Sequence, residues 1–239
     1  MQTGRIVVIK AVFFDLYGTL ARFQPPREEV QARACEPFGF KVAKDGLVQG
    51  YAVADEWMAK TNASPLPLPK MNREQRAGFF AEYERLVLFG TGINVDLQTA
   101  SQVWAAVRKI PYGLALFDDV LPTMDRLKWT GQILATLSNI TEDIQALSHR
   151  LGLAPYMDFA ITSWEVGKGK PHAPIFLAAL ERAGVPASEA LMVGDSYSSD
   201  VQGARGVGIR PLLLDREGII TDIDDCTKIR ALPEVMDHL

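Results

Sequence analysis

A carboxylate stands near the start of the chain, at the end of an apolar run and directly before a Gly-Thr turn. Residues 6–14 are rich in Val, Ile and Phe, and residues 15–19 read Asp-Leu-Tyr-Gly-Thr. Such a run is typical of a strand buried on both faces of a parallel sheet, and ligands bind outside the carboxyl ends of such strands. Asp15 can therefore attack an electrophile and form a covalent intermediate, while Gly18 lets a ligand approach the backbone. The motif alone is equally compatible with a buried strand that ends in an Asp turn.

Polar groups follow two further apolar stretches. Ser138 offers a hydroxyl and Asn139 a side-chain amide, and Lys170 precedes a proline. An ammonium group can offset the charge of a nucleophilic carboxylate and of a bound anion. Backbone N–H groups in the turn that contains Gly18 can cradle the same anion. These residue types indicate chemistry on an anionic substrate.

Two more carboxylates follow a short apolar run, in residues 194–200. Asp195 and Asp200 flank a Ser-Tyr-Ser-Ser segment. Together with Asp15 they would place three negative charges around one point, which requires a cation. Oxygen ligands beside a phosphate favour Mg²⁺.

Several of these residues also have a purely structural interpretation. Ser138 can cap the helix expected after it. Asp200 can act as an acidic residue at a helix N-terminus, although its spacing from Asp195 favours a shared role. Asp118 and Asp119 are interpreted as the start of a helix.

The elements expected to position these residues alternate between strand and helix. After the first strand, strands are predicted over 132–137, within 156–162, and over 190–193 and 211–214. Helices are predicted over 119–128, 142–151, 172–183 and 200–205. Repeated units of this kind predict an α/β fold with a doubly wound parallel sheet. All the polar motifs then lie at one edge of that sheet.

A helical block, residues 21–111, interrupts this pattern after the first strand. Consecutive prolines at 25 and 26 predict a helix start, and residues 64–69 predict an extended connector. Helices are expected from residue 27, over 45–60, over 73–89 and over 96–108, with no strand among them. The block is therefore expected to be a separate helical bundle above the carboxyl edge, with a core domain formed by residues 1–20 and 112–239.

Composition excludes several classes of partner. The net charge is −4 without a basic block, which argues against nucleic acid. The two cysteines and three histidines show no metal-binding or redox spacing, so a reduced, cytoplasmic setting is expected. The N-terminal apolar run is broken by Lys10 and predicts neither a signal peptide nor a membrane span. A small-molecule substrate is the expected partner.

The four motifs, in this order and spacing, resemble those of the haloacid dehalogenase superfamily of hydrolases. The resemblance covers the whole chain, including a helical cap inserted after motif one as in subfamily I, and implies a Rossmann-like core. It implies that Asp15 is the nucleophile, that Ser138 and Lys170 contact substrate, and that Asp200 supports the metal or the lysine. The implied catalytic residues are Asp15, Tyr17 and Lys170, the substrate-binding residues Gly18, Thr19, Ser138 and Asn139, and the Mg²⁺-binding residues Asp15, Tyr17, Asp195 and Asp200.

One position departs from the phosphatases of this superfamily. They carry a second Asp two residues after the nucleophile, where it protonates the leaving group, and this chain has Tyr17 there. That substitution resembles the 2-haloacid dehalogenase branch, whose members need no metal. That branch, however, lacks the Gly-Asp pair at Asp195 and carries an Asn where this chain has Tyr197. The sequence thus favours a Mg²⁺-dependent hydrolase of a small phosphorylated metabolite. The alternatives are a metal-independent dehalogenase and a phosphate-binding protein without turnover.

Overall fold

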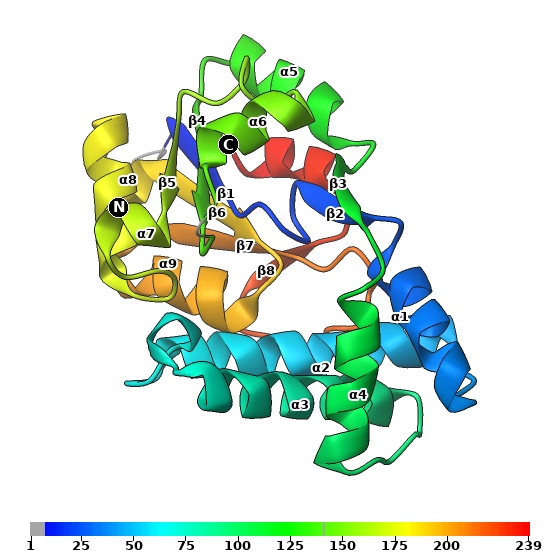
Figure 1. Ribbon diagram of the computed structural model, residues 1–239. Helices are drawn as coiled ribbons and strands as arrows, with labels where there is room; N and C mark the ends of the chain where they lie inside the picture. The colour runs from blue at the N-terminus through cyan, green and yellow to red at the C-terminus, as the bar shows by residue number, and fades with distance from the viewer. Residues whose placement is uncertain (1–7, 141) are drawn as a thin grey trace. The chain divides into compact units, whose positions relative to one another are not determined.

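The structure is a computed structural model that describes residues 8–140 and 142–239 (Figure 1). The chain forms two compact units. A core unit contains the described residues up to Arg22 together with Leu116–Leu239, and a cap unit contains Phe23–Ala115. From the sequence, the boundaries between the two units were predicted to follow residue 20 and to precede residue 112. No described helix is long and apolar enough to cross a bilayer.

A parallel sheet of six strands forms the centre of the core unit, in the order β5-β4-β1-β6-β7-β8. The central strand β1 (Ala11–Phe14) is fully buried and lies between β4 and β6, with Phe14 in register with Thr136 and Val193. Residues 6 and 7 of the predicted strand lie outside the described part of the chain. The other strands are β4 (Ile133–Ser138), β5 (Phe159–Thr162), β6 (Ala190–Gly194), β7 (Arg210–Leu214) and β8 (Thr227–Ile229). The predicted α/β class and parallel sheet are confirmed.

Helices cover both faces of this sheet. Figure 1 shows α5 (Val120–Trp129) and α6 (Ile144–Leu151) on the opposite side from α8 (Ala173–Ala183) and α9 (Gln202–Gly206). On the second face, Phe176 of α8 packs against Phe13 and Met192 from adjacent strands. α6 ends at Gly152 and α8 at Gly184, and both glycines have the left-handed conformation that commonly ends a helix.

Some elements of the structure were not predicted. β2 (Ala21–Gln24) and β3 (Gly113–Leu116) pair as a two-stranded sheet along the segments that connect the units, so the expectation that residues 21–111 contain no strand was wrong. Both strands are short and partly exposed, and they pair across about ninety residues of sequence. The sequence also missed β8, the one-turn helix α7 (Ser163–Val166) and a C-terminal 3₁₀ segment, Leu232–His238.

The cap unit contains the expected helices, α1 (Arg27–Cys35), α2 (Lys44–Ala63), α3 (Arg73–Gly90) and α4 (Leu97–Val107). Gly50 allows α2 and α3 to approach closely, because a β-carbon at that position would collide with the Val87 backbone. Trp57 stacks on Phe79 with 4.3 Å between ring centroids, and aromatic side chains of α2 and α3 form the core of the cap unit. The connector between α2 and α3 is not wholly extended, because Leu68–Lys70 forms a 3₁₀ turn.

Candidate active site

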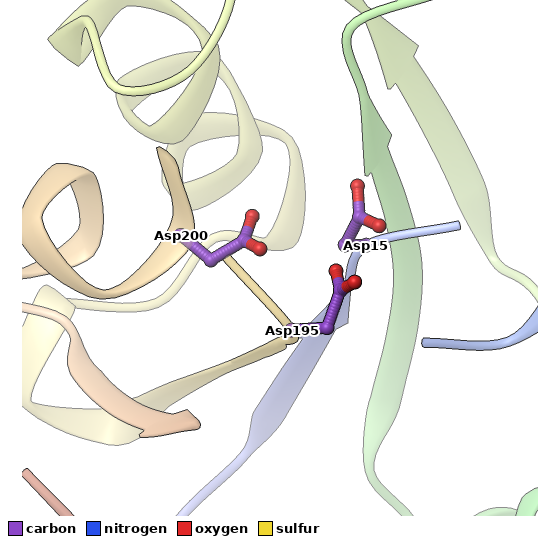
Figure 2. Close-up of side chains that lie close together, drawn as sticks. All are labelled: Asp15, Asp195 and Asp200. Carbon is purple, nitrogen blue, oxygen red and sulfur yellow. The ribbon is translucent and has the colours of Figure 1, made fainter. Parts of the chain in front are cut away.

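Three aspartates meet at the carboxyl edge of the sheet (Figure 2). Asp15 directly follows β1, Asp195 directly follows β6, and Asp200 lies in a single π-helical turn, Tyr197–Val201. The Asp15 N–H donates to the Val193 carbonyl at 2.9 Å, which extends the pairing of β1 and β6 up to the site. One carboxylate oxygen from each aspartate lies within 4.8 Å of the others. The three carboxylates that the sequence predicted to converge are therefore close together.

Two glycines make this close approach possible. Gly18 has a φ of +82°, and a β-carbon there would collide with the Asp195 carboxylate. A β-carbon on Gly194 would collide with the Asp200 side chain. Only glycine leaves the space that the carboxylates occupy, and the backbone at Gly18 has a conformation that other residues rarely adopt.

Lys170 joins two of the carboxylates. Its Nζ donates to Asp15 Oδ1 and, at 2.7 Å, to Asp200 Oδ1, and the lysine is buried. The second oxygen of Asp200 accepts from the Ser196 N–H at 3.1 Å. Asp200 is thus a partner of Lys170, one of the two roles that the sequence left open. Asp195 is the most exposed of the three carboxylates.

The electrostatics of this cluster favour a bound cation. Burial raises the pKa of Asp15 to about 6, although the Lys170 ammonium acts in the opposite direction. Burial alone would lower the pKa of Lys170, but Asp15 and Asp200 raise it above its ordinary value, so the ammonium stays charged. Lys170 pairs with Asp15 and Asp200, and Asp195 brings a third carboxylate close to both. The donor set consists of carboxylate oxygens, which fits Mg²⁺ better than a soft metal.

Ser138 does not cap the following helix. It is the last residue of β4, is buried, and lies in register with Thr162. α6 is capped instead by Asp143, whose carboxylate accepts from the Gln145 N–H at 2.9 Å. The capping interpretation is excluded, while the substrate contact remains a prediction.

Asn139 holds the backbone of Lys170. Its Nδ2 donates to the Lys170 carbonyl at 2.8 Å, and its Oδ1 accepts from the Lys170 N–H at 2.7 Å. Gly169 leaves room for this pair, because a β-carbon there would collide with the Asn139 amide. The sequence predicted a substrate contact for Asn139, and the structure adds this structural role. Asn139 and Lys170 are 31 residues apart, and no local sequence pattern predicts a contact between them.

The remaining predicted site residues lie in the loop of residues 15–19, hereafter the Asp15 loop. Tyr17 is half-buried, and its backbone forms a bridge with Ala21. Thr19 is buried, and its hydroxyl has no hydrogen-bond partner among the described residues. The roles of Tyr17, Gly18 and Thr19 in catalysis, metal binding and substrate binding remain predictions.

The chain matches the haloacid dehalogenase-like hydrolase family over residues 9–208. It is similar to the ribulose-1,5-bisphosphate 5-phosphatase of Halopiger xanaduensis, with 28% identity over 218 residues that cover 86% of this chain and 84% of that protein. It is also similar to the phosphoserine phosphatase of Thermus thermophilus, with 29% identity over 82% of this chain and 62% of that protein. The crystal structure of a 2-haloacid dehalogenase from Pseudomonas syringae superposes with a TM-score of 0.56 at 26% identity, covering 96% of this chain and 97% of that one. The chain belongs to the haloacid dehalogenase-like hydrolases.

Proposed function

We propose that this hydrolase is a Mg²⁺-dependent phosphatase of a small phosphorylated metabolite and that it acts through an aspartyl-phosphate on Asp15. The observation that carries the proposal is the convergence of the Asp15, Asp195 and Asp200 carboxylates, with the buried Lys170 ammonium bonded to Asp15 and Asp200. Carboxylate oxygens that converge in this way are the ligands that a divalent cation such as Mg²⁺ prefers. Asp15 and Asp195 are the residues we assign to it. Relatives named as phosphatases support the same reaction.

The residues of the site have distinct roles in this reaction. A carboxylate oxygen of Asp15 attacks phosphorus, the bond to the leaving oxygen breaks, and water then attacks the same phosphorus to release phosphate and restore the carboxylate. Lys170, held by Asp200 and Asn139, stays protonated and offsets the charge on Asp15 and on the phosphoryl oxygens. The N–H groups of the Asp15 loop and the Ser138 hydroxyl bind those oxygens. Mg²⁺, when bound, supplies the additional positive charge that brings the phosphate and the carboxylates together.

Tyr17 limits the range of good substrates. An alkoxide leaving group needs a proton in the transition state, and a tyrosine with an unperturbed pKa of about 10 releases its proton reluctantly. It is also a poor base for activating water. We therefore expect slow turnover of alkyl phosphates and faster turnover of acyl or aryl phosphates, whose leaving groups need no proton.

A metal-independent 2-haloacid dehalogenase is the second candidate. Two observations favour it: Tyr17 at the position of the acid, and the similarity to a solved 2-haloacid dehalogenase. A halide leaves without a proton, so that reaction needs no acid at position 17. It gives no role, however, to the Asp195 carboxylate beside Asp15 and Asp200. A phosphate-binding protein without turnover is the third candidate.

A panel assay separates the three candidates. Purified protein is given sugar phosphates, phosphoserine, acetyl phosphate, p-nitrophenyl phosphate and short 2-haloacids, each with Mg²⁺ and with a chelator. The proposal predicts phosphate release that the chelator abolishes. Halide release that survives the chelator would establish the dehalogenase instead, and binding of inorganic phosphate without any turnover would establish the third candidate.

A further inference from the structure

An arginine beyond the four motifs is bonded to the Asp15 loop. Arg216 lies two residues after the end of β7, and its side chain is largely buried. One terminal nitrogen donates to Thr19 O at 2.9 Å and to Asp119 Oδ1 at 3.0 Å, and the other donates to Asp119 Oδ2 at 2.9 Å. The guanidinium also lies over the Phe117 ring, 4.0 Å from its centre. One side chain therefore joins two segments, at Thr19 and at residues 117–119, that are far from each other and from Arg216 in the sequence.

The surroundings fix Arg216 in this position. Its neighbour Asp215 is buried and accepts hydrogen bonds from the N–H groups of Ile219 and Ile220, which shapes the loop after β7. Asp119 also accepts from the Leu232 N–H at 2.9 Å. Burial would raise the pKa of Asp119, but the bonds from Arg216 and Leu232 hold it below its ordinary value. The carboxylate thus stays ionised and keeps the guanidinium oriented.

The hydrogen bond from Arg216 to Thr19 O is a direct contact with the Asp15 loop. That loop is closed by the Leu20 and Ala21 N–H groups, which both donate to Leu16 O at 2.9 and 2.7 Å. Its conformation sets where the Asp15 carboxylate and the anion-binding N–H groups lie. The Phe117 N–H donates to Leu20 O at 3.1 Å, so the residue under the guanidinium is also hydrogen-bonded to the residue that follows this loop.

We propose that Arg216 is a positioning residue for Asp15 and that it acts by fixing the Thr19 carbonyl and Asp119 at once. Thr19 precedes β2 and Phe117 follows β3, so the same guanidinium anchors the core ends of both segments that lead to the cap unit. The proposal rests on the proposed function, because it assigns Arg216 to the reaction of Asp15. The requirement for an arginine is geometric: a lysine can pair with Asp119 but cannot bond both of its oxygens and Thr19 O with a planar group.

The test compares R216K and R216M with wild type and with K128M. Lys128 is the control because it lies near the end of α5, the helix that follows Asp119, and pairs with Asp158 at 2.7 Å, away from the Asp15 loop. The measurements are the thermal midpoint, kcat and KM for p-nitrophenyl phosphate with Mg²⁺, and hydrogen exchange of the amides of Leu20 and Ala21.

A displaced nucleophile should lower the rate more than the binding of substrate. We expect kcat to fall about tenfold to a hundredfold in both Arg216 variants with KM nearly unchanged. R216K should keep most of the stability but not the rate, and exchange at Leu20 and Ala21 should accelerate in both. K128M should match wild type in rate and exchange.

Folded Arg216 variants with wild-type kcat, or with wild-type exchange at the Leu20 and Ala21 amides that close the Asp15 loop, would overturn the proposal. A wild type that releases no phosphate from any ester would refute the proposed function instead. The exchange measurement then still tests the role of Arg216, because unchanged exchange in its variants would show that Arg216 does not fix the loop.

Discussion

Both units of the molecule bury carboxylates, but the partners of those carboxylates differ. In the core unit, Asp15 and Asp200 share the Lys170 ammonium, and Asp195 adds a third carboxylate nearby. In the cap unit, Glu84 is fully buried and accepts a hydrogen bond from the neutral amide of Gln31. The Tyr51 hydroxyl donates to Gln31 Oε1 at 3.0 Å, which directs the amide nitrogen toward Glu84.

The difference shows how the partners decide whether a buried acid carries charge. Burial raises the pKa of Glu84 to about 7, with only the Gln31 bond opposing the shift, and Glu84 Oε2 has no partner among the described residues. Burial raises the pKa of Asp15 as well, but there the Lys170 ammonium favours the ionised form. The core cluster holds ionised carboxylates beside a lysine, an arrangement that can take part in catalysis. The cap cluster pairs Glu84 with neutral polar groups and has a packing role only.

Replacing an acid with its amide tests this contrast, and Asp15→Asn should have the largest effect. The side chain is nearly isosteric, so the fold should remain, as circular dichroism and the thermal midpoint would show. Loss of a covalent nucleophile normally lowers turnover by several orders of magnitude, so we expect less than about a hundredth of wild-type kcat. Activity above that level in the folded variant would remove Asp15 from the mechanism.

Asp195→Asn should have the next largest effect, and it should act through the cation. Loss of groups that merely support a ligand weakens metal binding by about 10–100-fold, so loss of a ligand should weaken Mg²⁺ binding by at least as much. Calorimetric titration with Mg²⁺ measures the affinity, and activity should recover in part at high Mg²⁺. An unchanged affinity for Mg²⁺ would exclude Asp195 as a ligand.

Tyr17→Asp sharpens the contrast by adding an acid to the core cluster. It places a proton donor two residues after Asp15, and a positioned acid contributes about 10²–10⁴-fold. We expect turnover of alkyl phosphates to rise about tenfold or more within that range, with little gain on aryl phosphates. Equal or lower turnover of alkyl phosphates in a folded, Mg²⁺-binding variant would show that another group supplies the proton.

Glu84→Gln should have the smallest effect, on stability alone. Because the pKa of Glu84 is raised in the folded state, its neutral form contributes stability below about pH 4.5, and that contribution is lost as pH rises through about 7. Glu84→Gln should therefore raise the free energy of unfolding above pH 7 by on the order of 1–3 kcal/mol and flatten its dependence on pH.

The control for Glu84→Gln is Glu82→Gln on the same helix. Glu82 is partly exposed and pairs with Arg85 at 2.6 Å, so its replacement should leave that pH dependence in place. Turnover should be unchanged in Glu84→Gln. The same dependence of stability on pH in Glu84→Gln and in the wild type would show that Glu84 is ionised in the folded protein.

The features that could be predicted from the sequence are those encoded by short, contiguous patterns of residues. The buried run before Asp15 and the strands that end at Ser138 and just before Asp195 are each encoded by a few consecutive residues. Because parallel strands bring their carboxyl ends to one edge, the convergence of the aspartates followed from the order of the elements.

The sequence could not predict contacts between distant segments. Arg216 bonds Asp119 across 97 residues and Thr19 across 197, and no spacing rule links them. Asp119 was therefore interpreted only as the start of a helix, although its carboxylate is occupied by Arg216 and Leu232. The pairing of β2 with β3 was missed for the same reason, since two short, partly exposed strands carry little hydrophobic pattern.

Trapping of the covalent intermediate tests the central claim most directly. Enzyme in excess over acetyl phosphate or p-nitrophenyl phosphate is quenched in acid during a single turnover with Mg²⁺, and its peptides are analysed by mass spectrometry. We predict a phosphoryl group on Asp15 that disappears with a chelator and in Asp15→Asn. Full conversion of the substrate without any phosphoryl group on Asp15 at any quench time would contradict the account.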